Sequence, residues 1–516
     1  MRPNFPPEAC RLADRRDAIR RENAADPRLR QLSAEINALV SAHCKDLWLR
    51  HLKESDKGSK RLWSTIKNLS NPRRSGRPTL TFEGGTPLDS QKCCAALNRQ
   101  FVEHPARPNR DHRCIRRKIR SLSHTQDVEI TPEDVSKAIK AAKASTAIGP
   151  DGLAMIMLKH VGEKGLTYMA ETFSLCVNSL KIPDMWKLGK IIPIPKPGKP
   201  INMGSSYRPI TLLSPVIKVL ESILLPSLKE NLPMADHQHG FRTGHSTTTA
   251  LCEITTAIAG GLNSKRPHER TIVVALDLSK AFDTVCHTQL LQDLYDSTLP
   301  NVHKRWLANY MAGRQSYVEF RGSRSGLRRN KQGVPQGGVL SPILFNTYIS
   351  KIPTPPPGLK LISYADDCTI LCTGRDIEAL EEQLNSYLPT LQTFLADRNL
   401  QLSTPKSTAT LSTTWTKEVT RELNIHICGQ KVPTVKTPKI LGVHFDSLFM
   451  FAKHCEEVTR RVKGRNSILK ALTGSTWGKD KETILTTYKA IGRPLIDYAS
   501  PVWSPSVSDT QWRKLQ

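Results

Sequence analysis

One apolar run in the middle of the chain constrains the fold more than any other segment. Residues 271–276 read Thr-Ile-Val-Val-Ala-Leu, and the run ends on an acid, Asp277. Apolar and β-branched side chains on both alternating faces are typical of a strand that is covered on both sides of its sheet. An acid at the end of such a strand is costly to bury without a cationic partner. The run therefore predicts a central strand that presents Asp277 to a cation.

A second acidic position lies between two strand-like segments. Residues 359–364 and 368–372 are separated by Ala365, Asp366 and Asp367, which predicts a hairpin with carboxylates at its tip. Carboxylate oxygens from adjacent strands are the ligands that Mg²⁺ selects, and the three acids can hold two such ions. In a two-metal site one ion activates an attacking hydroxyl and the other stabilises the leaving pyrophosphate, which is nucleotidyl transfer. Adjacent aspartates in turns are usually solvated, so this interpretation depends on neighbouring segments.

The charge balance favours a polyanionic partner. The 516 residues include 75 Lys and Arg against 47 Asp and Glu, a formal charge of +28, which is typical of nucleic-acid binding. No apolar run reaches the roughly 18 residues that would span a bilayer, and residues 1–16 lack the apolar part of a secretory signal. We therefore expect an intracellular protein of several domains without a membrane role.

The cysteine and histidine pattern predicts no structural metal site. The 12 cysteines are scattered along the chain without the C-x2-C spacing of a zinc module. Five positions are close in sequence but match no ligand template: Cys93, Cys94, His104, His112 and Cys114. We interpret this grouping as chance clustering.

The remaining segments outline the periphery of the protein. Residues 11–69 are charged and helix-favouring, which indicates a basic helical extension. The Pro- and Gly-rich residues 71–87 and the basic residues 106–120 indicate linkers, and the latter either contact nucleic acid or form a solvated connector. Thr131 caps a helix that opens with Pro132. Residues 451–472 predict a helix with a basic face that suits phosphate contacts or exposure to solvent.

A series of motifs in the right order resembles the reverse transcriptases of non-LTR retrotransposons, the LINE-like elements, from about residue 131 to the C-terminus. The resemblance rests on the following segments: Gly149-Pro-Asp-Gly152, Lys190-Ile-Ile-Pro-Ile-Pro-Lys-Pro-Gly-Lys199, Tyr207-Arg-Pro-Ile-Thr-Leu-Leu213, His239-Gly-Phe-Arg-Thr-Gly-His-Ser246, Ala275-Leu-Asp-Leu-Ser-Lys-Ala-Phe-Asp283, Gln332-Gly-Val-Pro-Gln-Gly-Gly-Val-Leu-Ser-Pro342, Tyr364-Ala-Asp-Asp367 and Leu441-Gly-Val443.

The resemblance implies an α+β right-hand polymerase. Its parts are a basic helical extension and linker at residues 1–125, fingers at 126–270, a ferredoxin-like palm with an antiparallel sheet at 271–451, and the start of a helical thumb at 452–516. The helical pattern continues to the last residues, so we expect an incomplete thumb. Two Mg²⁺ ions, or Mn²⁺, would bind Asp277, Asp366 and Asp367, with Asp367 the least direct ligand.

The same resemblance implies roles for residues around the metal site. Lys196 and Arg208 match positions that hold the incoming triphosphate, although ordinary surface bases would give the same pattern. Phe282 matches the position that abuts the sugar and disfavours a ribose 2′-OH. Gln336 and Gly337 match a loop where backbone approaches the template base and nucleotide. Lys406 aligns with a lysine that protonates the leaving pyrophosphate.

The implied function is RNA-directed DNA polymerisation. The partners would be an RNA template, a DNA or RNA primer and deoxynucleotides, and the site of action would be the nucleus, where such elements prime on chromosomal DNA. The two endonuclease types of the family have no counterpart here, so we expect target cleavage from elsewhere. Two alternatives stay open, namely a non-catalytic truncated remnant that only binds nucleic acid and a maturase of the group II intron type.

Overall fold

The computed structural model describes residues 5–23, 26–55, 58–70, 89–103, 112–123, 127–473 and 478–515. The chain divides into two compact units, of which unit 1 contains helices and unit 2 contains helices and sheets. Unit 1 contains residues 1–76, 452–500 and 507–516, whereas unit 2 contains residues 77–451 and 501–506. The four domain ranges expected from the sequence remain predictions.

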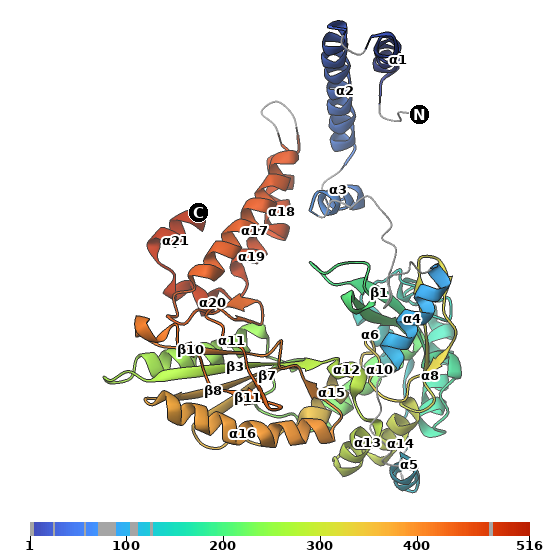
Figure 1. The fold of residues 1–516 in the computed structure, drawn as a ribbon. Coiled ribbons are helices and arrows are strands. Elements are labelled where there is room, and N and C mark those ends of the chain that lie inside the picture. The colour runs from blue at the N-terminus through green and yellow to red at the C-terminus, as the bar shows by residue number, and fades with distance from the viewer. Residues whose placement is uncertain are drawn as a thin grey trace. The chain divides into compact units, whose positions relative to one another are not determined.

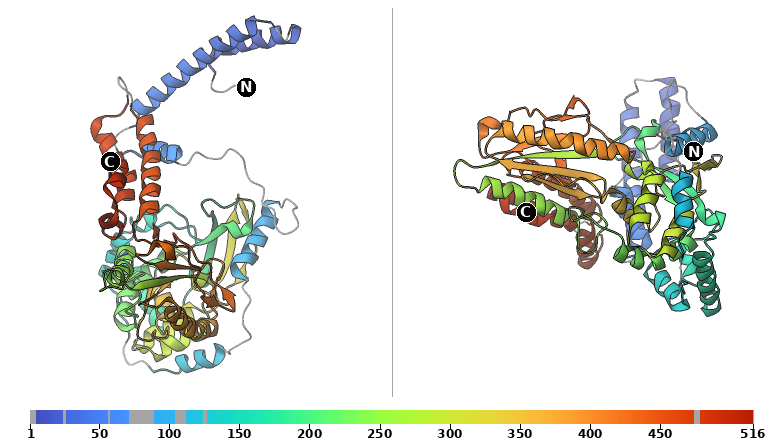
Figure 2. Two further views of the ribbon diagram at one scale, coloured as in Figure 1. Left: turned by 60° about the vertical axis from the view of Figure 1, so that its left-hand side comes forward. Right: turned by 90° about the horizontal axis from the view of Figure 1, so that it is seen from below.

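The central sheet of unit 2 has the strand order β10-β3-β8-β7, and β9 also pairs with β3. The bounds are β3 (Arg270–Ser279), β7 (Leu359–Tyr364), β8 (Asp367–Gly374), β9 (Gln401–Leu402) and β10 (Thr408–Ser412). All pairings are antiparallel. Helix α11 (Thr247–Leu262) packs on one face and α16 (Ile377–Asp397) on the other (Figures 1 and 2). This double cover confirms the expectation that the run at 271–276 is a strand buried on both faces.

A second sheet in unit 2 has the order β2-β1-β4-β5, with β6 also paired to β4. The bounds are β1 (Leu188–Pro195), β2 (Tyr207–Leu212), β4 (Gln315–Phe320), β5 (Ser323–Arg324) and β6 (Arg328–Arg329). Helix α4 (Ser90–Val102) packs against β4 and β5, where Asn98 Nδ2 donates to Ser325 Oγ at 2.8 Å. The apolar side of α4 thus packs on this sheet. The sequence of the helix gave no indication of this contact.

Helices surround both sheets and enclose one large apolar core. The capping box at Thr131 and Asp134 starts α6 (Pro132–Ala141), as the sequence predicted. Further long helices around this core are α8 (Glu163–Asn178), α10 (Pro215–Asn231), α13 (His287–Asp296), α14 (Asn301–Tyr310) and α15 (Ser341–Ile349). Shorter elements are α7 (Met155–Leu158), α9 (Asp184–Lys187), α12 (Ala281–Thr284), and the hairpins β11 (His426–Ile427) with β12 (Gln430–Lys431) and β13 (Lys439–Ile440) with β14 (Val443–His444).

The sequence predicted a linker at residues 106–120, and this prediction is wrong for residues 112–120. Residues 112–120 form helix α5 (His112–Arg120), which packs against α13 and α14. Ile115 and Ile119 lie one helical turn apart and are buried in the main core, so their burial outweighs the local excess of charge. Residues 71–87 and 106–111 lie outside the described segments.

Unit 1 joins helices from the two ends of the chain. It contains α1 (Pro7–Glu22), α2 (Arg28–Lys53), α3 (Lys60–Ser70), α17 (Ala452–Ala471), α18 (Lys481–Ile491), α19 (Arg493–Asp497) and α21 (Asp509–Leu515). Leu52, Leu62 and Ile66 share an apolar cluster with Ile468 and Leu472. The indole Nε1 of Trp48 donates to the carbonyl of Ala471 at 3.3 Å. The sequence predicted these helices but not their association.

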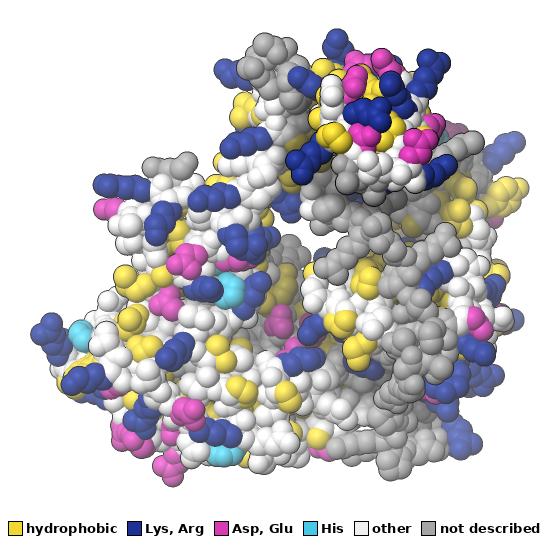
Figure 3. All heavy atoms as spheres, turned by 45° about the horizontal axis from the view of Figure 1, so that its top comes forward, with side chains coloured by type: hydrophobic (Ala, Val, Ile, Leu, Met, Phe, Trp, Pro, Cys, Tyr) yellow, Lys and Arg dark blue, Asp and Glu magenta, His cyan; other side chains and the backbone are white. Residues whose placement is uncertain are grey.

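Positive charge is dispersed over the described part of one face of the molecule. Figure 3 shows Lys and Arg side chains spread across the visible face, with fewer Asp and Glu side chains among them. Among the described helices, none combines the length and apolar character that a bilayer span requires.

A buried ion pair between α13 and the end of α16 makes the stability of unit 2 testable. Arg398 donates to both carboxylate oxygens of Asp293 at 2.6 and 3.1 Å, and the two side chains are 6% and 1% exposed. Asp293→Ala leaves a buried guanidinium without its partner, so we expect a loss of about 3–5 kcal/mol in urea unfolding. Glu422→Ala, which removes an exposed pair with Lys431, should cost at most about 1 kcal/mol. Equal losses in the two variants would contradict this account.

Candidate functional site

The strand register brings the three predicted acids to one edge of the central sheet. Asp277 on β3 is the cross-strand partner of Asp367 on β8, and Asp367 in turn pairs with Tyr364 on β7. Directly opposed residues of antiparallel strands have Cα atoms roughly 4.5–5.5 Å apart. The turn between β7 and β8 contains Ala365 at a φ of 56° and Asp366. The hairpin with acids at its tip is therefore confirmed.

The crowding of these carboxylates alters their titration. Burial, and after it the charge of Asp277, raises the pKa of Asp366, which is half-buried. Loss of surrounding water together with the charges of Asp366 and Asp277 raises the pKa of Asp367 to about 6. Both shifts mean that adding negative charge at this edge is unfavourable. A bound cation would reverse that penalty.

Lys406 supplies a positive charge beside Asp277. Its ammonium group lies 3.2 Å from Asp277 Oδ2, with side chains 67% and 37% exposed. The turn that carries Lys406 is tied to the end of β3, because Ser403 N donates to the carbonyl of Asp277 at 2.9 Å and Asp277 N donates to Ser407 Oγ at 3.2 Å. The predicted neighbourhood of Lys406 and the acids is thus present.

The donor set at this edge fits a divalent metal in its chemistry. Its ligand atoms are carboxylate oxygens only, which is what Mg²⁺ and Mn²⁺ prefer. In the described segments, however, no group of three or more His, Cys, Asp or Glu side chains is arranged closely enough to hold an ion. For a metal ion to bind, the carboxylates of Asp277, Asp366 and Asp367 would have to move closer together, and Asp277 would have to release Lys406.

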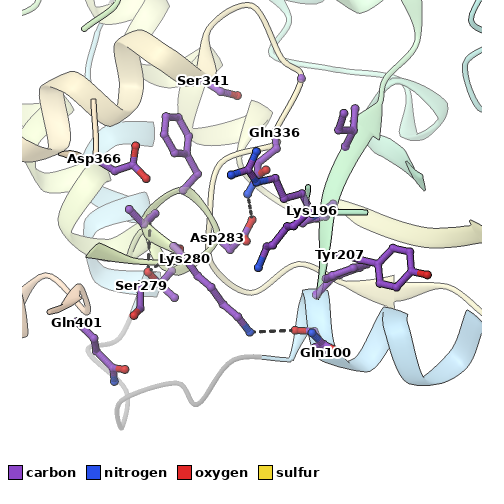
Figure 4. A pocket seen from close by; sticks show the side chains of 18 of the residues that line it. Gln100, Lys196, Tyr207, Ser279, Lys280, Asp283, Gln336, Ser341, Asp366 and Gln401 are labelled. Carbon is purple, nitrogen blue, oxygen red and sulfur yellow. Dashed lines mark hydrogen bonds between the residues drawn. The ribbon is translucent and has the colours of Figure 1, made fainter. Parts of the chain in front are cut away.

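A cavity of about 920 Å³ opens beside the acids and collects most of the other predicted residues. Its lining includes Lys196, Arg208, Phe282, Gln336, Gly337, Asp366 and Lys406. Figure 4 shows Asp366 on one side and Lys196 on the other, with Asp283 and Gln336 between them. Gln100 and Phe101 of α4 also line it, so a helix from outside the recognised motifs contributes to the wall.

Cations line the cavity on more than one side: Lys196 and Arg208 lie at β1 and β2, whereas Lys280 and Lys406 follow β3 and β9. Lys196 Nζ donates to the carbonyl of Ser205 at 2.8 Å. Burial lowers the pKa of Lys196, and the nearby charges of Lys406 and Arg208 lower it further. An anion in the cavity would relieve this repulsion, so the wall is suited to a phosphate-bearing ligand.

Phe282 is held rigidly at the cavity. Its ring stacks on Phe345 with centroids 4.3 Å apart and planes 18° apart. Phe241 meets the same ring edge-on at 6.2 Å. Because Phe345 is fully buried on α15, it holds the Phe282 ring in place. The ring can therefore exclude part of a ligand by steric contact.

The loop that carries Gln336 is fixed through both backbone and side chain. Thr211 N of β2 donates to the carbonyl of Gln336 at 2.8 Å. The amide Nε2 of Gln336 donates to Asp283 Oδ1 at 2.7 Å, while burial raises the pKa of Asp283 to about 6. A Cβ at Gly337, whose φ is 136°, would lie 2.3 Å from the carbonyl oxygen of Thr211. Only glycine fits at that approach.

A buried acid that the sequence did not single out anchors the same loop. Glu221 on α10 is fully buried and accepts hydrogen bonds from the Tyr310 hydroxyl at 2.7 Å and from the backbone N–H groups of Val339 and Leu340. Burial raises the pKa of Glu221. A lone Glu in an amphipathic helix gives no signal of this role, because the partners lie about 90 and 120 residues away along the chain.

Comparison with known proteins agrees with this geometry. Residues 194–445 match the family model described as reverse transcriptase (RNA-dependent DNA polymerase). The chain is 28% identical over 386 residues to the probable RNA-directed DNA polymerase from transposon BS of Drosophila melanogaster, covering 72% of this chain and 41% of that protein. It is 29% identical over 388 residues to the corresponding protein from transposon X-element of the same species, covering 73% and 42%.

A further relative is the RNA-directed DNA polymerase from mobile element jockey of Drosophila funebris, 27% identical over 385 residues that cover 72% of this chain and 41% of that protein. The chain thus spans less than half the length of these relatives. The matched region contains the acidic sheet edge and most of the cavity wall. The chain therefore carries a reverse transcriptase domain of the non-LTR retrotransposon type.

Proposed function

We propose that this chain is an RNA-directed DNA polymerase that adds deoxynucleotides to a primer 3′-OH by a two-metal mechanism. The observation that carries the proposal is the pairing of Asp277 with the Asp366–Asp367 turn beside a cavity that Asp366, Lys196 and Arg208 line together. Acids that can bind metal and cations that can bind triphosphate are the two halves of a nucleotidyl-transfer site.

In this proposal Asp277, Asp366 and Asp367 hold the metals, which when bound activate the primer hydroxyl and stabilise the leaving pyrophosphate. Lys196 and Arg208 bind the triphosphate from the opposite wall. Lys406 carries the proton to the leaving pyrophosphate and exchanges its ion pair with Asp277 for this role. The family match to reverse transcriptases supports these assignments.

Phe282 and Gln336 shape the nucleotide position in the same proposal. The ring of Phe282 excludes a ribose 2′-OH, because Phe345 prevents it from yielding. Gln336 and Gly337 present backbone and an oriented amide to the template base and the nucleotide. Asp283 positions Gln336 through its 2.7 Å hydrogen bond.

The proposed architecture is a right hand with fingers at 126–270, a palm at 271–451 and a thumb at 452–516. The template would be RNA and the primer DNA or RNA. Exposed basic residues on α5 and α17 suit contacts to the phosphate backbone that are independent of sequence and weakened by salt. We place the activity in the nucleus, with target cleavage supplied by an endonuclease domain or protein outside these residues.

Primer extension with and without one metal ligand tests the function directly. Asp366→Asn keeps the shape of the turn but removes a charge that the cations need, so we expect extension on an RNA template with Mg²⁺ or Mn²⁺ to fall roughly 10³-fold. Asp397→Asn, at an exposed position that does not line the cavity, is the matched control and should keep wild-type activity. A wild-type chain that binds primer–template but never extends it would instead identify a non-catalytic binding protein.

Sugar discrimination depends on the Phe282 ring. Phe282→Ala opens space beside the nucleotide sugar, and we expect the preference for deoxynucleotides over ribonucleotides, measured as a ratio of kcat/KM values, to fall roughly 10- to 100-fold. Phe282→Tyr keeps the ring and should keep the ratio. An unchanged ratio in the alanine variant would remove the steric role of Phe282.

Lys406 has two opposed effects that can be separated. Lys406→Met removes the proton donor, so we expect kcat to fall roughly 10²-fold. The same change frees Asp277 from its ion pair, so Mn²⁺ binding measured by electron paramagnetic resonance should tighten. Lys431→Met, which removes a cation paired with Glu422 instead, is the control for net charge. Weaker Mn²⁺ binding in Lys406→Met would contradict the competition between lysine and metal.

A further inference from the structure

The backbone of the acidic turn is held by a side chain that belongs to neither β7 nor β8. Gln238 is 1% exposed, and its amide reaches the peptide groups of Ala365. Gln238 Oε1 accepts the N–H of Ala365 at 2.8 Å, and Gln238 Nε2 donates to the carbonyl of Ala365 at 3.3 Å. Both polar groups of one turn residue are therefore satisfied by one side chain.

The segment around Gln238 is itself fixed to β7. His239 N donates to the carbonyl of Ser363, and Ser363 N donates to the carbonyl of His237, each at 2.8 Å. These bonds form a short parallel bridge between Gln238 and Ser363. The backbone of Gln238 therefore cannot move away from β7 without breaking this bridge.

Gly240 lets the segment approach the turn. A Cβ on Gly240 would lie 2.3 Å from Ala365 N, so any other residue would push the two segments apart. Gly240 N also donates to Gln238 Oε1 at 2.7 Å, which fixes the rotation of the amide. The carbonyl of Gly240 accepts from Asn346 Nδ2 at 2.8 Å, and Asn346 is buried on α15.

Ala365 adopts a backbone conformation that its surroundings must stabilise. Ala365 has a φ of 56°, a left-handed conformation that non-glycine residues adopt only where the surroundings impose it. This conformation determines the direction of the next residue, Asp366. An Ala365 that relaxed to negative φ would turn the Asp366 carboxylate away from Asp277 and from the cavity.

We propose that Gln238 is a positioning residue for catalysis: its amide clamps Ala365 in the left-handed conformation that aims Asp366 at the metal-binding edge. The inference rests on the proposed polymerase function for its consequence on rate. The hydrogen bonds between Gln238 and Ala365 do not depend on that function, and hydrogen exchange tests them without nucleotides.

The test compares Gln238→Met, of similar length but without the amide, with Ser363→Ala. Ser363→Ala removes a buried hydroxyl of the same bridge, whose Oγ donates to the carbonyl of His237 at 3.3 Å, but leaves the clamp. In Gln238→Met we expect amide hydrogen exchange at Ala365 to quicken roughly 10-fold. We also expect weaker Mn²⁺ binding by electron paramagnetic resonance, and a kcat roughly 10- to 100-fold lower at unchanged KM for primer–template. Ser363→Ala should show none of these changes.

Gln238→Glu provides a rescue variant, because one oxygen of its carboxyl group can still accept the N–H groups of Ala365 and Gly240, and the other, protonated at this buried position, can donate to the carbonyl of Ala365. We expect slow exchange at Ala365 to return in this variant. Unchanged exchange or unchanged Mn²⁺ affinity in Gln238→Met would overturn the clamp, as would equal effects of Ser363→Ala. A wild-type chain that extends no primer would overturn the proposed function alone, since exchange and Mn²⁺ binding are measured without nucleotides.

Discussion

The antiparallel pairing of β3 with β8 is the constraint on which the site depends. Its register sets Asp277 opposite Asp367, and the side chains of β3 pack against α11 on one face and α16 on the other. A shift by one residue would exchange the two faces of the strand, so its side chains would meet different partners and Asp277 would no longer oppose Asp367. The apolar residues of β3 thus act on the chemistry indirectly, by allowing one alignment of the acids.

Local patterns predicted the elements whose determinants are close in sequence. The strand before Asp277, the hairpin around Asp366 and the capped helix at Thr131 each depend on a few adjacent residues, and each is present. Helix α5 was misjudged because its basic residues dominate the composition, whereas Ile115 and Ile119 determine its burial. The association of α2 and α3 with α17 and α18 had no local signal, since its contacts join residues more than 400 positions apart.

In the candidate site as well, residues within short motifs were predicted, whereas contacts between distant segments were not. Residues within motifs, such as Lys196, Phe282 and Gln336, were identified through the resemblance, and they line one cavity. The contacts that hold those motifs in place were not predicted. Glu221, Asp283 and Gln238 are polar side chains with distant partners, and each secures backbone or an amide that belongs to another segment. Sequence spacing cannot reveal such contacts, because they depend on the packing of the finished fold.

The pairing of chain ends in unit 1 has a consequence for the order of events during synthesis. Trp48, Leu52, Leu62 and Ile66 emerge early, yet their apolar partners Ile468, Leu472 and Ile484 are translated some 400 residues later. At typical elongation rates of about 5–20 residues per second, these side chains stay uncovered for roughly 20 to 80 seconds. Helices α2 and α3 are therefore made well before the side chains that bury them, a period in which chaperones or nucleic acid can reach them.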